Sequence, residues 1–241
     1  MTELAQPVAI RLTVSFAQAI YEDSHEVDGV RARRSDKAGW PKVVRQGWVA
    51  VLVDPHASVL DHISPTVVVD AIMAKRNSGT RRRDGSIVIA LGPGFTAGAD
   101  ADAVIETERG HELGRIIREG GAREDTGVPG EIGGRSSERV LRSPADGRVS
   151  STKRIGNMVA SGDVVMRVGE IPVLAPFDGC IRGLIHDGLT VSRGMKIGDV
   201  DPRGEARHAV TVSDKARAIG RAVLEAALMV GRELGLLRLE T

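Results

Sequence analysis

A glycine-rich stretch near the middle of the chain is the segment best suited to binding a charged ligand. Gly92, Gly94 and Gly98 follow the apolar run Ser86–Leu91 directly, with a proline and two aspartates close by. This composition predicts tight turns that leave backbone N–H groups exposed. Such groups can hold an anion in a concave nest of backbone donors.

Polar side chains follow the glycine-rich stretch in close order and could perform acid–base chemistry. His111 has an ordinary pKa near neutrality, so it is a candidate acid or base. Glu106 could orient it, and Arg109 would complete an anion pocket. The alternative for His111 is an exposed polar residue without a catalytic role. Glu106 and His111 are the predicted catalytic residues.

Three apolar runs are expected to position this segment. Trp48–Val53, Thr66–Met73 and Ser86–Leu91 are typical of buried strands, and short connections favour parallel pairing. Open α/β sheets bind ligands beyond the carboxyl ends of their strands. The predicted ligand-binding residues at these ends are Asp70, Lys75, Arg76, Asn77, Gly92, Gly94, Phe95, Thr96 and Arg109. The alternative is that these are ordinary loop residues.

Several other motifs are weak evidence for a binding site. Gly92-x-Gly94 resembles the start of a dinucleotide fingerprint, but no helix is predicted after it, so we predict no dinucleotide site there. Glu3 lies just before a predicted helix that begins at Pro7. An acidic residue at such a position could bind a ribose hydroxyl, and the alternative is a solvated glutamate. Arg81–Arg83 is interpreted as a solvated loop, with phosphate binding as the alternative. We predict no metal site, because the histidines are scattered and Cys180 is the only thiol.

The second half of the chain contains an internal repeat with a period of 32 residues. Pro144, Asp146, Gly147 and Val149 recur as Pro176, Asp178, Gly179 and Ile181, and Gly156, Val159, Gly162 and Val165 recur as Gly188, Val191, Gly194 and Ile197. Two such copies should interlock, because one alone has too little apolar surface. The pattern resembles the barrel-sandwich hybrid fold of biotinyl and lipoyl carriers. The link Arg167–Pro172 offers no lysine, so a covalent cofactor arm is not expected.

A long amphipathic helix is predicted after Ser213, which can cap it, with Asp214 in its first turn. Its apolar stripe comprises Ile219, Val223, Ala226, Ala227, Val230, Leu234 and Leu237. The stripe would pack on the chain's own core or form a homodimer seam.

The expected fold class is therefore α/β, in three parts. Residues 1–107 form a Rossmann-like parallel sheet that is N-terminally incomplete. Residues 108–205 form the β-rich module with the repeat, and residues 206–241 form the C-terminal helix.

Composition excludes several functional classes. Lys and Arg number 33 against 32 Asp and Glu, and only 2% of the residues are aromatic. Neither a strong positive field nor stacking platforms for nucleic acid are present, so we expect no nucleic-acid partner. The apolar runs are too short to span a membrane, and a single cysteine suits a reducing compartment. We therefore expect a cytoplasmic protein without a membrane partner.

Long motifs distributed over nearly the whole sequence resemble one family. They are residues 1–7, 13–16, 69–77, 91–98, 104–107, 109–115, 126–130, 196–203 and 213–220. These resemble the YqeB-type accessory proteins of the selenium-dependent molybdenum hydroxylase system. Members of that family carry a further strand, a glycine-rich turn and a helix ahead of the Met1–Glu3 segment. We expect either a late-assigned start or a true short form here, and nucleotide binding that needs that turn is then in question.

The resemblance implies a maturation factor for a molybdenum hydroxylase related to xanthine and purine dehydrogenases, whose apoenzyme is the expected partner. One hypothesis is an accessory protein that binds a nucleotide-like or cofactor-like anion, such as a nucleotide or the molybdenum cofactor. A second is an enzyme that modifies that cofactor or a selenium species. A third is a docking protein without a small-molecule site. The residue types do not identify the ligand.

Overall fold

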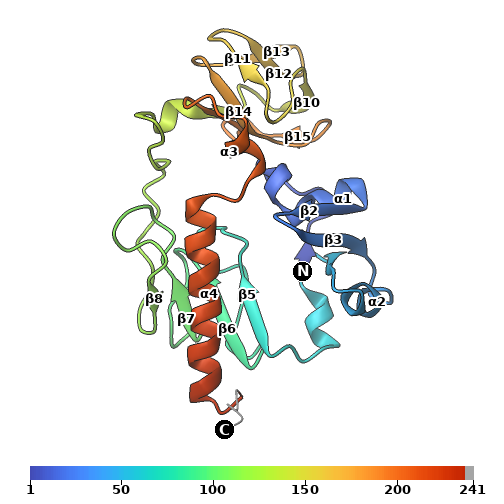
Figure 1. Cartoon of the computed structure of the whole chain (residues 1–241), viewed down its shortest axis with the longest axis vertical. Coiled ribbons are helices and arrows are strands. Elements are labelled where there is room, and N and C mark those ends of the chain that lie inside the picture. The colour runs from blue at the N-terminus through green and yellow to red at the C-terminus, as the bar shows by residue number, and fades with distance from the viewer. Residues whose placement is uncertain (237–241) are drawn as a thin grey trace. The chain divides into compact units, whose positions relative to one another are not determined.

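The structure is a computed structural model that describes residues 1–236. Over these residues the fold is mixed α/β, as predicted, with four four-stranded sheets and a long C-terminal helix (Figure 1). The chain divides into two compact units. Unit 1 comprises Met1–Ser58 and Pro129–Val212, and unit 2 comprises Val59–Val128 and the chain from Ser213 onward. These units are interleaved along the sequence, so their boundaries differ from those of the three predicted parts.

The first sheet of unit 1 has the strand order β1-β4-β3-β2. Its strands are β1 (Thr2–Glu3), β2 (Ser24–Val27), β3 (Val30–Ser35) and β4 (Val49–Val53), and its helices are α1 (Ala19–Glu22) and α2 (Trp40–Arg45). Strands β1, β4 and β3 are parallel, whereas β2 is antiparallel to β3. A small core of Ala19, Ile20, Ala32 and Val51 lies against this sheet.

The helix predicted from Pro7 is not present. Only the short 3-10 turns η1 (Leu12–Val14) and η2 (Phe16–Gln18) and the single turn α1 form there. Ser15 has an extended backbone between the two 3-10 turns, and its hydroxyl accepts a hydrogen bond from the Ala17 N–H. A serine that bonds its own neighbouring backbone competes with helix formation, which explains the interruption.

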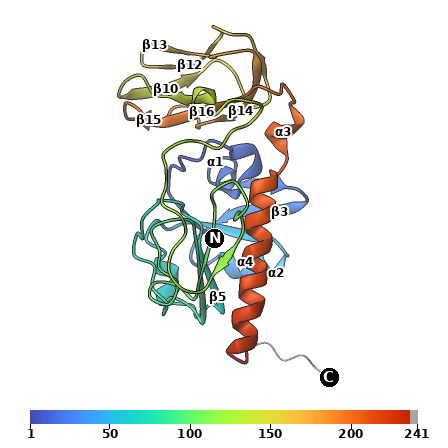
Figure 2. The same cartoon turned by 90° about the vertical axis from the view of Figure 1, so that its left-hand side faces the viewer.

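The rest of unit 1 is a β module built from the repeat (Figure 2). Its strands are β9 (Val140–Arg142), β10 (Gly147–Ser151), β11 (Met158–Val159), β12 (Val164–Val168), β13 (Ile171–Leu174), β14 (Gly179–Leu184), β15 (Thr190–Val191) and β16 (Lys196–Asp201). The turn η4 (Ser137–Arg139) precedes them and the short helix α3 (Arg207–Val210) follows. All strand pairs in the module are antiparallel.

The repeat is visible in the strand positions. Strands β10, β11 and β12 of the first copy begin 32 residues before β14, β15 and β16 of the second. The sheet orders are β13-β12-β10-β15 and β11-β14-β16-β9, so each sheet takes two strands from each copy. Exchanging the copies converts one order into the other. One continuous core, including Val149, Met166, Ile181 and Ile197, fills the space between the sheets.

Unit 2 contains the second α/β sheet, with the strand order β5-β6-β7-β8. Its strands are β5 (Val67–Asp70), β6 (Ile87–Leu91), β7 (Ala103–Ile105) and β8 (Ile116–Ile117). Strands β5, β6 and β7 are parallel and β8 is antiparallel to β7. The turn η3 (Ser58–Asp61) leads into this unit. The run Trp48–Val53 therefore belongs to a different sheet from the other two apolar runs, which corrects the expectation of one sheet.

Both faces of the central strand β6 are covered. Ile87 and Ile89 pack against Ala222 and Ala226 of α4 (Asp214–Glu233), which lies along this sheet in Figure 1. Val88 and Ala90 pack on the other face against residues of the glycine-rich loop, including Phe95. Two covered faces explain why β6 is a continuous apolar run.

Further predictions concern strand β5 and helix α4 of unit 2. Strand β5 was expected to be buried, but it is the edge strand, and Val67 and Val69 are exposed. Ser213 does cap α4, since its hydroxyl accepts a hydrogen bond from the Ala216 N–H. Leu237 of the predicted apolar stripe lies outside the described residues.

Candidate functional site

The carboxyl ends of β5, β6 and β7 meet at one edge of the unit 2 sheet. In the register of these strands Asp70 lies beside Ala90, and Leu91 lies beside Ile105. The loops that follow the three strands therefore start from the same edge. Asp70, the last residue of β5, and these loops together include all the predicted site residues: Asp70, Lys75, Arg76, Asn77, Gly92, Gly94, Phe95, Thr96, Glu106, Arg109 and His111.

The first two loops are packed directly against each other at Gly94. This residue has a φ of 98°, and a Cβ atom added to it would lie 2.4 Å from Arg76 Cα. Only glycine permits that close approach of two backbones. Met73 and Lys75 also have positive φ angles of 58° and 61°. Strained backbone in non-glycine residues is frequent at functional sites.

Two of the predicted polar residues hold the first loop in shape. Asp70 is 5% exposed and accepts hydrogen bonds from the Ile72 N–H and the Thr80 hydroxyl. Asn77 Oδ1 accepts from the Gly79 and Thr80 N–H groups. These side chains therefore organise the loop.

The glycine-rich loop is closed by its own contacts. Phe95 is buried in the core beneath it, and the Thr96 N–H donates to Asp100 Oδ2. Gly92 has a φ of 78°, and a Cβ there would lie 2.7 Å from Thr107 Oγ1. The loop thus also approaches the Thr107 side chain after β7, less closely than it approaches the Arg76 backbone.

Glu106 and His111 do not form the predicted acid–base pair. Glu106 is 3% exposed, and its carboxylate accepts hydrogen bonds from the N–H groups of Thr107, Glu108 and Arg123. The His111 side chain is 93% exposed, and its Nε2 lies 4.0 Å from Glu112 Oε1. A buried carboxylate that serves three backbone donors is a structural group, and it leaves His111 without the predicted orienting partner.

Ion pairs link this edge to two other parts of unit 2. Lys75 Nζ lies 2.5 Å from Asp125 Oδ2, and Arg109 makes a bidentate pair with Asp214 at the start of α4. The hydrogen bond from Lys75 lowers the pKa of Asp125. Arg109 therefore lies at this edge as predicted, with its guanidinium already paired.

Lys215 is a member of this site that the sequence interpretation missed. It lies next to Asp214 and is half-buried, and its side chain forms no hydrogen bond or ion pair with any residue from 1 to 236. Burial, and then the Arg109 guanidinium, lower the pKa of its ammonium group, against the opposing influence of Glu106, Asp125 and Asp214. The sequence signal that could have identified Lys215 as a site residue was its position two residues after Ser213, the N-cap of α4.

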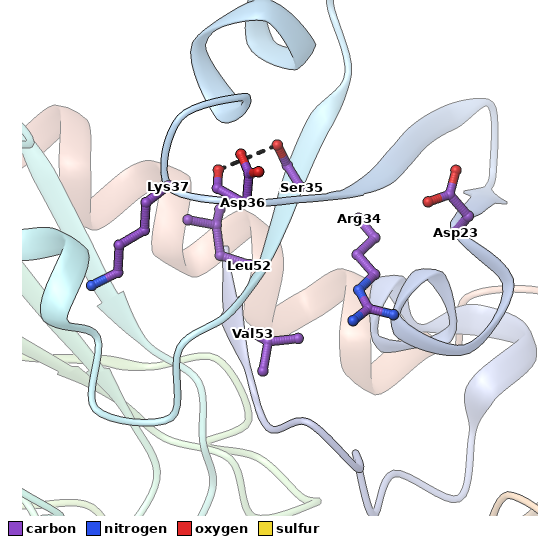
Figure 3. A pocket seen from close by; sticks show the side chains of 7 residues that line it. All are labelled: Asp23, Arg34, Ser35, Asp36, Lys37, Leu52 and Val53. Carbon is purple, nitrogen blue, oxygen red and sulfur yellow. Dashed lines mark hydrogen bonds between the residues drawn. The ribbon is translucent and has the colours of Figure 1, made fainter.

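Unit 1 has an open hollow at the corresponding edge of its own parallel strands (Figure 3). The hollow has a volume of about 610 Å³ and is lined by Asp23, Arg34, Ser35, Asp36, Lys37, Leu52 and Val53. Figure 3 shows Lys37 on one side, and Arg34 with Asp23 on the other. Basic and acidic groups thus alternate around it.

A chain of hydrogen bonds runs from the wall of this hollow to a buried carboxylate. Lys37 Nζ donates to Ser58 Oγ at 2.7 Å, and Ser58 Oγ donates to Asp54 Oδ1 at 2.8 Å. Asp54 is 5% exposed and directly follows β4. Asp54 directly follows the predicted strand Trp48–Val53, but the sequence interpretation did not identify Lys37 or Ser58.

Within residues 1–236, no group of three or more His, Cys, Asp or Glu side chains could hold a metal ion. None of the helices in this range is long and apolar enough to cross a membrane.

Comparison with known proteins identifies one relative of high similarity. The chain is 51% identical over 231 residues to the uncharacterized protein YqeB of Escherichia coli (strain K12). The match covers 95% of this chain and 43% of YqeB, so the chain spans less than half the length of that relative. No family model matches the chain. The identity confirms the resemblance predicted from the motifs: over the matched residues the chain is similar to YqeB.

Similarity to solved structures is weak. An aspartoacylase family protein from Mesorhizobium loti has 15% identity and a TM-score of 0.26, covering 35% of this chain and 27% of its own. The product-bound ectoine utilization protein EutE (DoeB) from Ruegeria pomeroyi has 21% identity and a TM-score of 0.25, with the same coverage. At these TM-scores neither structure supports an argument about this chain.

Proposed function

We propose that unit 2 binds a nucleotide-like or cofactor-like anion at the carboxyl edge of β5, β6 and β7. The observation that supports this most directly is Lys215, a half-buried ammonium group without a hydrogen bond or ion pair among the described residues. Arg76, on the adjacent loop, is exposed and equally without a partner in residues 1–236. An anion would supply the missing partner for both cations.

The loops offer further support for this site. The chain between β5 and Gly94 holds two non-glycine residues at positive φ, and Gly94 keeps two loops in backbone contact. Such an arrangement is fixed before a ligand arrives, which reduces the entropic cost of binding. Ligands of open α/β sheets bind at this edge.

On the resemblance to YqeB-type proteins, we propose that this binding serves the maturation of a selenium-dependent molybdenum hydroxylase. The chain would then act as an accessory factor toward a xanthine dehydrogenase-like apoenzyme. The absence of a Glu106–His111 pair weighs against the alternative in which these residues catalyse a reaction on the cofactor.

The finer fold assignments form part of the same proposal. Three parallel strands with ligand groups at their carboxyl ends support a Rossmann-like origin for the α/β sheets. The exchanged strands of the β module support a barrel-sandwich hybrid. Neither assignment is needed for the anion site.

The anion site can be tested with ADP and molybdate as probes. We expect at least one of them to raise the thermal unfolding midpoint of the full chain, because a ligand that binds only the native state stabilises it. The double variant Arg76→Gln, Lys215→Gln should reduce that affinity at least tenfold. The control Arg221→Gln removes one positive charge from an exposed position of α4 and should bind as the wild type does.

Two outcomes would overturn the proposal. One is the absence of stabilisation by either probe, and the other is unchanged affinity in the double variant. The maturation role has a separate test, the activity of a molybdenum hydroxylase produced in cells that lack this protein. Full hydroxylase activity there would refute that role, whatever the anion binding shows.

A further inference from the structure

Strand β14 of unit 1 contains a β-bulge at Arg182. The face of β14 around this bulge, called the covered layer below, is buried under other segments of unit 1. The pairing of β14 with β16 shifts register between Ile181 and Gly183, so Arg182 has no partner residue on β16. Bulges of this kind re-aim a side chain. Arg182 is only 7% exposed, which is unusual for an arginine.

Two segments of unit 1 cover this face of β14. A Cβ added to Gly183 would lie 2.8 Å from the Ile10 carbonyl oxygen, and Arg11 forms a β-bridge with Leu184. Helix α3 contacts β14 as well. Arg11 joins the two segments by donating to the carbonyl groups of His208 and Thr211.

The covered layer contains more basic groups than carboxylates. The carboxylates are Asp199 and Asp201, which are 4% and 1% exposed. The basic side chains that interact with them electrostatically are Arg11, Arg139, Arg182, Lys196 and Arg203. Arg139 donates to Asp199 at 2.6 Å, and Arg203 makes two side-chain hydrogen bonds to Asp201. Both carboxylates are thus already engaged by other arginines.

Arg182 is left without a hydrogen bond. No nitrogen of its guanidinium donates to any residue of the described chain, and its nearest carboxylate contact is Nε to Asp201 Oδ2 at 3.8 Å. His208 Nδ1 and the Nε atoms of Arg11 and Arg139 are also buried without a hydrogen-bond partner. Burial lowers the pKa of Arg182, and it lowers the pKa of Arg11 to about 10. A buried guanidinium that makes no hydrogen bond, and whose contact with Asp201 is shared with the closer Arg203, is costly, which indicates that a further counter-charge is missing.

We propose that Arg182 and the basic groups around it bind a tetrahedral oxyanion of the phosphate class. A guanidinium presents parallel N–H donors that match two oxygens of such an ion. The half-buried Lys196 forms no side-chain hydrogen bond or ion pair within residues 1–236, lies within electrostatic range of Asp199 and Arg182, and adds a second positive charge. This site lies in unit 1 and shares no residue with the anion site proposed in unit 2.

The test uses the full chain with inorganic phosphate, against chloride at equal ionic strength. At phosphate concentrations about ten times the dissociation constant, we expect the unfolding midpoint to rise by about 4 °C. Arg182→Gln should weaken phosphate binding at least tenfold by calorimetry. Arg193→Gln removes the same charge from an exposed position of the β module and should leave the affinity unchanged.

A second variant guards against misfolding of the first. If Arg182→Gln does not fold, Lys196→Gln replaces it, with the same expected direction and a loss of at least threefold. Unchanged affinity in whichever variant folds would overturn the proposal. So would the absence of a phosphate-specific rise, or binding that Lys215→Gln abolishes and Arg182→Gln retains, since the phosphate would then occupy unit 2.

Glycerol 3-phosphate as a second probe distinguishes the two sources of this chemistry. Binding of both compounds indicates a site open to phosphate monoesters. Binding of phosphate alone indicates a site that holds a free ion. Either result supports the oxyanion site, and binding of neither refutes it.

Discussion

The two α/β sheets of this protein have the same make-up and very different edges. Each has three parallel strands and one antiparallel strand, β1, β4, β3 and β2 in unit 1 and β5, β6, β7 and β8 in unit 2. In unit 1 the carboxyl edge opens into a hollow of about 610 Å³. In unit 2 the same edge is occupied by loops in backbone contact and by ion pairs.

The difference shows what strand topology alone contributes to a site. Parallel strands bring the following loops to one edge, and this holds in both units. Whether the edge is hollow depends on the loops. In unit 2, Gly94 lets the glycine-rich loop contact the backbone of Arg76. The Glu106 carboxylate, directly after β7, accepts a hydrogen bond from the Arg123 N–H. In unit 1 the residues after β3 form a local turn, because Asp36 Oδ1 accepts hydrogen bonds from the Ala38 and Gly39 N–H groups.

If the unit 2 edge is a packed element, the largest effect should come from Gly94→Ala. The new Cβ would meet the Arg76 backbone and also strain the positive φ angle. We expect a loss of about 4 kcal/mol in the free energy of unfolding, measured by urea denaturation. Gly98→Ala is the matched control, since Gly98 has a φ of 91° but nothing within 4 Å of a Cβ. It should cost only about 1 kcal/mol. Equal losses in the two variants would contradict backbone packing at Gly94.

Glu106→Gln should have the next largest effect. The amide replaces one acceptor oxygen with a donor, which then faces a backbone N–H group. We expect a loss of about 2 kcal/mol in the free energy of unfolding. Glu124→Gln, at an exposed position, should change it by less than about 0.5 kcal/mol. A Glu106→Gln variant with unchanged stability would remove the structural role assigned to this carboxylate.

The unit 1 edge should be less sensitive. Ser58→Ala removes the hydroxyl between Lys37 and Asp54, and we expect a loss of about 1 kcal/mol by urea denaturation. Ser24→Ala, on an exposed position of β2, serves as the control and should be neutral. A loss for Ser58→Ala as large as that for Gly94→Ala would mean that both edges are packed elements, and the contrast between them would fail.

The smallest effect is expected for Lys75→Met, which breaks an exposed ion pair in unit 2. The cost in stability should be below about 1 kcal/mol at neutral pH. The pair lowers the folded-state pKa of Asp125, so its contribution is present above the unfolded value and is lost as the pH falls through the folded pKa. The difference between variant and wild type should therefore vanish in acid.

A carboxylate-detected NMR titration measures the same effect directly. In Lys75→Met the pKa of Asp125 should rise toward its ordinary value of 3.8. Lys42→Met, at an exposed position of α2, should leave the Asp125 titration unchanged. An unchanged Asp125 titration in Lys75→Met would show that the pair does not form in solution.

Much of the secondary structure was predictable because local sequence decides it. The run before Gly92 is apolar on both faces, and β6 is covered on both faces. The Ser213 cap and the start of α4 follow from one side chain and its neighbours. The repeat specified pairs of strands 32 residues apart. The helix expected from Pro7 failed because a single serine side chain offered the backbone another partner.

The candidate site was predictable only as a set of loops. Strand order placed Asp70, Gly92 and Glu106 at one edge, as parallel pairing requires. The partners of their side chains depend on residues distant in sequence: Arg123 for Glu106, Asp125 for Lys75 and Asp214 for Arg109. Lys215 could be recognised as a site residue only from the packing of α4 on the sheet.

The sequence by itself determined that the three apolar runs are strands, where the chain repeats and to which proteins it is related. These properties depend on local patterns of apolar residues, glycines and caps, and on shared motifs. Tertiary structure alone decided that the parallel strands form two sheets, that Glu106 is a structural carboxylate and that Arg182 is buried without a hydrogen bond. Burial and pairing arise when distant segments exclude water from a group, and no local pattern specifies which segments those will be.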